Sequence, residues 1–255
     1  MIYSMEIRGR IWYFTRPMQM ESPQTDRLDL LALGLEPLVE RLSNGFGKGL
    51  FHASALYRDV FKNGSRTPLE SDAFSPRLAR ALGGRVRIEP GQVVDVFSQG
   101  DLTKFITRLS DGLKIESVII PMASRRTLCV SSQVGCRMGC RFCQTARMGF
   151  RRSLTVSEIT GQLFNARFEL GADIKNVVFM GMGEPLDNFD NVVCAARIMN
   201  EQKGFDVAFR HITISTAGLT DGIRKLGRLN LGNIRLAVSV NSPDPVVRSG
   251  LMPVN

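Results

Sequence analysis

The sequence has little with which to cross a membrane or to build a disulfide framework. No apolar run approaches the roughly 18 residues that a transmembrane helix needs, and the apolar stretch 11–14 is too short for the core of a signal peptide. Cysteines number only five, and three of them are clustered. Thiols in that arrangement are typical of ligands or nucleophiles in a reducing compartment. We therefore expect a soluble, cytoplasmic protein that does not associate with a membrane.

Acidic residues are absent from one long window. No Asp or Glu occurs from Ser117 to Ser157, in a chain of 255 residues whose net charge is +9. A basic surface alone is more often a solubility feature than a binding site. This window, however, also holds a set of arginines that flank the cysteines: Arg125, Arg126, Arg137, Arg141, Arg147, Arg151 and Arg152. A field of one sign predicts a phosphate-backboned substrate.

The first third of the chain predicts a small helical module. Residues 1–26 carry little pattern, and we expect a loosely ordered extension there. Helical spacing then occurs over 28–44 and 53–62, and a third helix is predicted from Ser75 to the glycine pair at 83–84. We expect residues 27–84 to form a module of the RNA-binding type. Strands predicted at 86–88, 93–97, 103–109 and 113–120 give a short antiparallel sheet over 85–121.

Strands and helices alternate from residue 122 to 255. Strands are predicted at 127–131, 176–180, 211–215 and 234–240, with helices at 155–171, 191–202 and 219–229 between them. Such alternation predicts an α/β fold with a parallel sheet and right-handed crossovers. A closed eight-stranded barrel needs more strands than these four. We therefore expect an incomplete βα barrel preceded by the helical module and the antiparallel strands.

Cys136, Cys140 and Cys143 form a CxxxCxxC run. Three thiolates this close do not suit a disulfide framework, and they fall one short of a closed zinc site, so the spacing favours an iron-sulfur cluster with an open coordination position. A structural zinc site completed by Cys129, by a histidine or by a partner chain is the alternative. Cys194 stands alone in a predicted helix and is expected to lie in its core. No second ligand is spaced with His52 or His211, which we expect to be packing or surface residues.

These motifs together resemble one family. The CxxxCxxC run directly after a strand is similar to the radical S-adenosylmethionine (SAM) superfamily. The fuller run 126–150, the Gly-Met-Gly-Glu-Pro run 181–185, and the runs 210–218, 236–241 and 251–255 resemble the RlmN/Cfr RNA adenine methylating enzymes. The resemblance covers about residue 28 to the end of the chain. It implies methylation of an adenine, at C2 in preference to C8, in ribosomal or transfer RNA.

The resemblance also implies the cofactors. The three cysteines would bind a 4Fe-4S cluster with one iron left free for the amino and carboxylate groups of SAM. An electron from a donor such as flavodoxin or ferredoxin would then cleave SAM into methionine and a 5′-deoxyadenosyl radical, so that the cofactor performs the hard step and the protein orients it.

Six further residues match SAM-contacting positions of the family. Gly183 and Glu184 match contacts to the methionine end, where a carboxylate suits the ammonium. The other matches, to the sugar, carboxylate or adenine, are Ser215, Ser239, Val240 and Asn241. Asn241 stands where the family often has a histidine. From the residues alone, the glycine run equally fits a tight turn after a strand, and a serine at a strand end is usually a turn former.

Two residues match chemical roles in the family. A cysteine at the Cys129 position resolves a covalent enzyme–RNA adduct through a disulfide, and a carboxylate at the Glu116 position removes a proton from the substrate. Without the resemblance, Cys129 is more simply a buried strand residue and Glu116 a solvated one.

The family also has a methyl-bearing cysteine in a loop near its C-terminus, and none of the five cysteines here matches it. We therefore expect a truncated product, a fragment or half of a split protein that does not methylate RNA alone. Two alternatives stay open: a radical SAM enzyme with a different product, and a catalytically dead RNA-binding remnant or zinc-stabilised nucleic-acid module.

Overall fold

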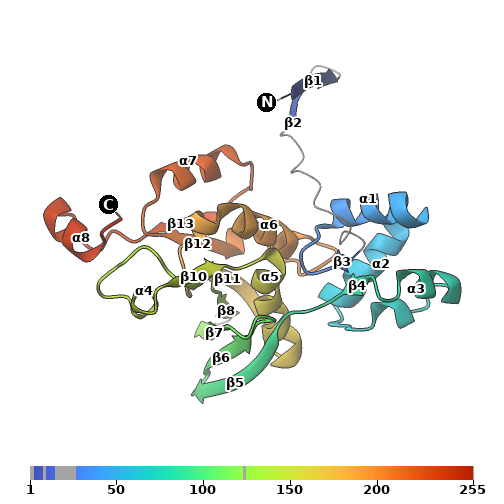
Figure 1. Cartoon of the computed structure of the whole chain (residues 1–255), viewed down its shortest axis with the longest axis horizontal. Coiled ribbons are helices and arrows are strands. Elements are labelled where there is room, and N and C mark those ends of the chain that lie inside the picture. The colour runs from blue at the N-terminus through green and yellow to red at the C-terminus, as the bar shows by residue number, and fades with distance from the viewer. Residues whose placement is uncertain (1–2, 8–9, 15–26, 123–124, 255) are drawn as a thin grey trace.

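Figure 1 shows the computed structural model of the chain, which describes residues 3–7, 10–14, 27–122 and 125–254. Within the predicted extension 1–26, strands β1 (Tyr3–Ile7) and β2 (Arg10–Phe14) pair as an antiparallel hairpin, and the remainder of that extension lies outside the described residues. Over the described ranges, no helix combines the length and the apolar character needed to cross a membrane.

The predicted helical module consists of α1 (Leu35–Phe46), α2 (Leu50–Phe61), a 3-10 turn η1 (Pro68–Glu70) and α3 (Pro76–Leu82). The prediction for the first helix was wrong at its start. Residues 28–29 instead form β3 (Leu28–Asp29), which pairs in parallel with β4 (Val86–Arg87), and α1 begins only after Gly34. Burial of leucines in 28–31 against the module's core outweighs their helical spacing.

One seven-stranded sheet runs through the rest of the molecule in the order β13-β12-β11-β8-β7-β6-β5. Its antiparallel part is β5 (Gln92–Gln99), β6 (Leu102–Arg108) and β7 (Lys114–Met122). Its parallel part is β8 (Arg125–Cys129), β11 (Ile174–Phe179), β12 (Ile212–Thr216) and β13 (Arg235–Val238). The four parallel strands predicted from the sequence are confirmed, and β7 pairs with β8 so that both parts form one sheet.

Helices follow the parallel strands as expected. α5 (Val156–Phe164) opens with a capping box, in which the Thr155 hydroxyl accepts from the Glu158 backbone N–H. A π-helical turn, η2 (Asn165–Glu169), continues it. The remaining elements are the 3-10 turns η3 (Pro185–Asn188) and η4 (Phe209–His211) and the helices α6 (Phe189–Asn200), α7 (Thr220–Arg228) and α8 (Pro245–Leu251).

The strand register separates two faces of the sheet. One face carries Leu128, Val177 and Ile214, which share a buried core with Leu163 of α5 and Val192 of α6. On the opposite face, Cys129 lies across from Val118 of β7 and Val178 of β11, and this alternation continues along each strand. We call this second face the open face, because α5 and α6 pack against the other one.

Candidate functional site

The three clustered cysteines lie in a loop held between two short strands. β9 (Gln133–Gly135) pairs with β10 (Phe150–Ser153), and a single helical turn, α4 (Gln144–Arg147), lies within the loop. Gly135 has φ 77°, and a Cβ atom there would overlap the Gly149 carbonyl oxygen, so only glycine fits. The backbone N–H of Cys136 donates to the same Gly149 oxygen at 3.3 Å. The sequence did not reveal this hairpin, because its strands are short and polar.

Most of the residues predicted to form the site line one cavity of about 350 Å³ at the carboxyl ends of the parallel strands. The structure brings together Cys136, Cys140, Cys143, Gly183, Glu184, Ser215 and Ser239. Cys136 is buried, whereas Cys140 and Cys143 are half-buried, and all five cysteines are free thiols. Met252, which sequence reasoning missed, also lines the cavity and accepts a hydrogen bond from Asn241 at its sulfur, at 2.9 Å.

The cavity fits a sulfur-ligated cluster with a small molecule beside it. Three thiols supply soft ligands and leave a coordination position open, and the volume lies within the roughly 300–1,000 Å³ of ligand pockets. Burial raises the pKa of the Cys136 and Cys140 thiols, so metal binding has to displace their protons. In the part of the chain that the structure describes, no three His, Cys, Asp or Glu side chains are arranged as they would be around a metal ion. The thiols thus share a cavity without being closed around a metal.

Glu184 lines the same cavity as the three cysteines. Its side chain accepts from the backbone N–H of Leu186 at 3.0 Å and of Ala217 at 2.7 Å, and the residue is buried. Burial raises the pKa of this carboxyl, while the hydrogen bonds from Ala217, Leu186 and Thr216 act to lower it. The carboxylate therefore ties the loop after β11 to the loop after β12.

Gln133 is a second residue that sequence reasoning missed. Its side-chain oxygen accepts from the Glu184 backbone N–H at 3.0 Å, and its amide nitrogen donates to Asp187 at 2.7 Å. A Cβ on Gly183, whose φ is 101°, would lie 2.5 Å from the Cβ of Gln133. Gln133 thus joins the cysteine hairpin to the Gly-Met-Gly-Glu-Pro run. The one signal in the sequence is a glutamine inside a segment that is otherwise apolar or small.

The remaining predicted residues lie outside the cavity lining. Cys129 is buried on the open face and hydrogen-bonds to the backbone of Met180, which does line the cavity. Glu116 is on the same face, since it lies two residues from Val118, the partner of Cys129. Its side chain is half exposed and pairs with Lys104 at 3.6 Å. Val240 and Asn241 follow β13 and are exposed.

Comparison with known proteins decides the family. Residues 130–252 match the model of the radical SAM superfamily. The fold is similar to the crystal structure of a radical SAM methyltransferase from Sphaerobacter thermophilus, with a TM-score of 0.80 and 33% identity over 89% of this chain and 68% of that one. The chain belongs to the radical SAM superfamily. Proteins of this superfamily use SAM together with a 4Fe-4S cluster, which confirms the predicted cofactors.

The chain is similar in sequence to RlmN-type members of the radical SAM superfamily. It is 40% identical to the probable dual-specificity RNA methyltransferase RlmN 1 of Protochlamydia amoebophila, over 89% of this chain and 64% of that protein. It is 42% identical to the dual-specificity RNA methyltransferase RlmN of Syntrophus aciditrophicus, over 90% of this chain and 66% of that protein. The chain therefore spans about two thirds of the length of these relatives, and the predicted RlmN/Cfr-type resemblance is confirmed.

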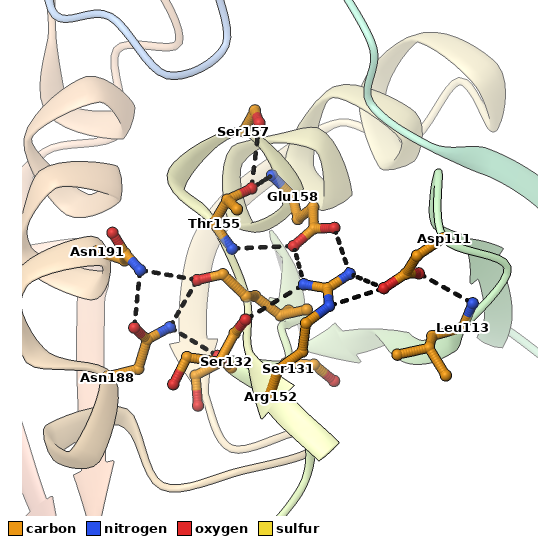
Figure 2. Close-up of polar contacts among 12 residues, drawn as sticks. Asp111, Leu113, Ser131, Ser132, Arg152, Thr155, Ser157, Glu158, Asn188 and Asn191 are labelled. Atoms are coloured by element: carbon orange, nitrogen blue, oxygen red, sulfur yellow. Dashed lines mark hydrogen bonds and ion pairs between the residues drawn. The ribbon is translucent and has the colours of Figure 1, made fainter. Parts of the chain in front are cut away.

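The arginines of this radical SAM chain divide into two groups. Arg152 lies between Asp111 and Glu158, at 2.7 Å from a carboxylate oxygen of each (Figure 2). Arg137 pairs with Asp187 at 2.9 Å and lies over the Phe150 ring. These two guanidiniums stabilise the fold. Among the described residues, the arginines near the cysteines that form no ion pair are Arg141, Arg147 and Arg151, and all three are exposed.

Proposed function

We propose that this protein takes part in the methylation of an adenine of ribosomal or transfer RNA, at C2 in preference to C8, with SAM, a 4Fe-4S cluster and a methyl-carrying cysteine that is none of its own five. The observation that carries the proposal is the convergence of three cysteines, the Gly183–Glu184 turn and two strand-end serines on one cavity. RNA as the substrate is supported by the names of the similar RlmN proteins. When bound, the cluster and SAM supply the electron and the radical chemistry that attack an unactivated adenine carbon.

In this proposal the cavity residues bind and orient the cofactors. Cys136, Cys140 and Cys143 hold the cluster through their thiolates. Gly183 allows the backbone to approach the methionine end of SAM, and the buried carboxylate of Glu184 suits its ammonium group. Further contacts to the sugar, carboxylate or adenine come from Ser215, Ser239, Val240 and Asn241.

The open face of the sheet holds the substrate base. Glu116 removes a proton from the adenine. The Cys129 thiolate attacks the sulfur of the methyl-carrying cysteine that links RNA to protein, so that a disulfide forms as the carbon–sulfur bond breaks and the released carbon takes up a proton from water. The placement of Glu116 and Cys129 on one face of β7 and β8 supports these roles, because a base splayed out toward the cavity can meet both side chains. The Glu116 carboxylate lies 3.6 Å from Lys104 on the same sheet.

The partners follow from charge and exposure. Arg141, Arg147 and Arg151 contact RNA phosphates around the cavity, and the helical module at 27–84 binds structured RNA by its shape. A flavodoxin or ferredoxin delivers the electron in the cytoplasm, and exposed Phe142 and Met148 leave the cysteine loop accessible to it.

The test is the modified-nucleoside content of the source organism's RNA. Ribosomal and transfer RNA from cells with and without this gene are digested and analysed by mass spectrometry. We expect 2-methyladenosine to fall or disappear on deletion and to return when the gene is restored. Loss of 8-methyladenosine alone would overturn the preference for C2. Unchanged levels of both nucleosides would overturn the proposed methylation.

A further inference from the structure

A second cavity lies at the opposite end of the parallel strands from the cysteines. Its volume is about 840 Å³, and it is lined at the amino-terminal ends of β8, β11 and β12 by Arg125, Ile174 and His211. Lys62, just after α2 of the helical module, lines the other side. The five residues of β8 place Arg125 roughly 13 Å from Cys129, the end of the strand nearer the cysteine loop.

Positive charge dominates this second cavity. Arg167 is occupied, because it donates to the carbonyl oxygens of Phe205 at 2.6 Å and Ile174 at 2.8 Å. Lys175 is paired with Asp173 at 2.8 Å, which leaves Asp206 as the other acid in the lining. Three other cations line the cavity and form no ion pair within the described ranges. They are Lys62, Arg125 and Arg210.

These cations converge on one residue. His211 lies in the lining, and Arg235 begins β13, where it lies across from Thr213 of β12. The pKa of His211 is lowered by burial and then by the charges of Arg125, Arg210 and Arg235. Arg125 and Arg210 share the lining with His211, and an anion bound between these like charges would offset their repulsion.

We propose that this cavity is a phosphate-binding site, formed by Lys62, Arg125 and Arg210 beside His211 and separate from the cavity that the three clustered cysteines line. Guanidinium groups suit phosphate because they donate two parallel hydrogen bonds and stay charged. The phosphates come from an RNA backbone or from a free polyphosphate. The site extends beyond the proposed methylation, since no cluster, SAM or reacting base is needed for binding.

The test compares two double variants that remove the same charge. Arg125→Gln with Arg210→Gln changes the cavity, whereas Arg197→Gln with Arg224→Gln removes two exposed arginines from α6 and α7. Fluorescence anisotropy with a labelled RNA hairpin at several salt concentrations measures binding of an RNA backbone. Calorimetry with inorganic pyrophosphate measures binding of a free polyphosphate. Circular dichroism confirms that each variant is folded.

If RNA supplies the phosphates, the cavity variant lowers the slope of log affinity against log salt by about 2 and weakens binding about tenfold, and the control variant does not. If a free polyphosphate is the ligand, pyrophosphate binding disappears in the cavity variant alone. Equal binding of both probes by the two variants would overturn the proposal.

An imidazole signal gives an independent reading. The chain has two histidines, so a His52→Gln variant assigns the His211 resonance in a proton NMR titration. A bound phosphate offsets the arginine charges, and the pKa of His211 is expected to rise when pyrophosphate or RNA is added. An unchanged titration in the presence of both probes would contradict the site. SAM binding, measured on the same variants, separates this result from the fate of the proposed methylation.

Discussion

Glu184 and Ala217 are joined by a 2.7 Å hydrogen bond from the Ala217 backbone N–H to a carboxylate oxygen. The other carboxylate oxygen accepts from Leu186 at 3.0 Å. One buried side chain therefore fixes two loops that line the cavity of the three clustered cysteines, and these loops follow β11 and β12.

Glu184→Gln is expected to weaken both the fold and SAM binding. An amide offers one acceptor oxygen, so one of the two backbone N–H groups faces an NH₂ group, at a cost of about 1–3 kcal/mol in the free energy of unfolding. Urea denaturation and equilibrium dialysis of SAM measure the two effects. Glu169→Gln is the control, because that carboxylate is in an exposed ion pair with Arg66. Equal behaviour of the two variants would show that Glu184 does not fix the loops.

Gly183→Ala is expected to disrupt the cavity of the three clustered cysteines. The new Cβ would lie 2.5 Å from the Cβ of Gln133, at a φ of 101° that L-residues rarely adopt. Gly227→Ala is the matched control, since its Cβ would enter open space within α7 and is expected to stabilise the protein by about 0.5–1 kcal/mol. Thermal unfolding and SAM titration of both variants check this. A Gly183→Ala protein as stable as Gly227→Ala would rule out the close approach to Gln133.

Gln162→Leu is expected to destabilise the protein, because it removes the buried hydrogen bonds that join α5 to β7 and to the segment after β8. The Gln162 side chain accepts from the Ser117 hydroxyl at 2.9 Å and from the Ser131 N–H at 2.7 Å, and donates to the Ser131 carbonyl at 2.9 Å. The leucine would leave the Ser117 hydroxyl and the Ser131 backbone groups buried without hydrogen-bond partners. This loss should lower the free energy of unfolding by roughly 2–4 kcal/mol. Gln202→Leu, at an exposed position, should change it little. The midpoints of urea unfolding decide between the two expectations.

Asp111→Asn is expected to destabilise the protein in a pH-dependent way. Burial acts to raise the pKa of Asp111, but hydrogen bonds from Arg152 and from the Leu113 N–H lower it below the ordinary 3.8. Because the folded-state pKa is lowered, the stabilisation is present above pH 3.8 and is lost as the pH falls through the folded-state value. At neutral pH we expect a loss of roughly 0.5–1 kcal/mol, since Asp111 is partly exposed. A loss that persists unchanged in acid, or one that Asp101→Asn reproduces, would contradict the ion pair as its cause.

The parallel strands and the cysteine loop could be predicted because their signals are local. Cys136, Cys140 and Cys143 fall within eight residues, and buried strands such as 176–180 are nearly continuous apolar runs. Contacts between distant segments left no such signal. The role of Gln133 depends on Glu184, 51 positions away, and the start of the first helix was mispredicted because β4 lies far from β3 in sequence.

The number of arginines near the cysteines could be read from the sequence, but which of them form ion pairs could not. The window 117–157 has no acidic residue, yet Arg152 pairs with Asp111 and Glu158, which lie just outside it. Of the seven arginines counted along the sequence, Arg137 and Arg152 form ion pairs and the first two begin β8. In the described part of the fold, three exposed arginines without an ion pair are then left beside the cysteines. The cationic cavity around His211 could not be predicted, because its arginines come from three separate strands or turns.

The central claim is that Cys136, Cys140 and Cys143 hold a cluster beside bound SAM. The most direct measurement is the electron paramagnetic resonance spectrum of the anaerobically reconstituted, reduced protein before and after SAM is added. We predict a 4Fe-4S signal that SAM shifts, that Cys140→Ala abolishes and that Cys194→Ala leaves intact. One bound zinc with no such signal, or a signal that persists in Cys140→Ala, would contradict the account.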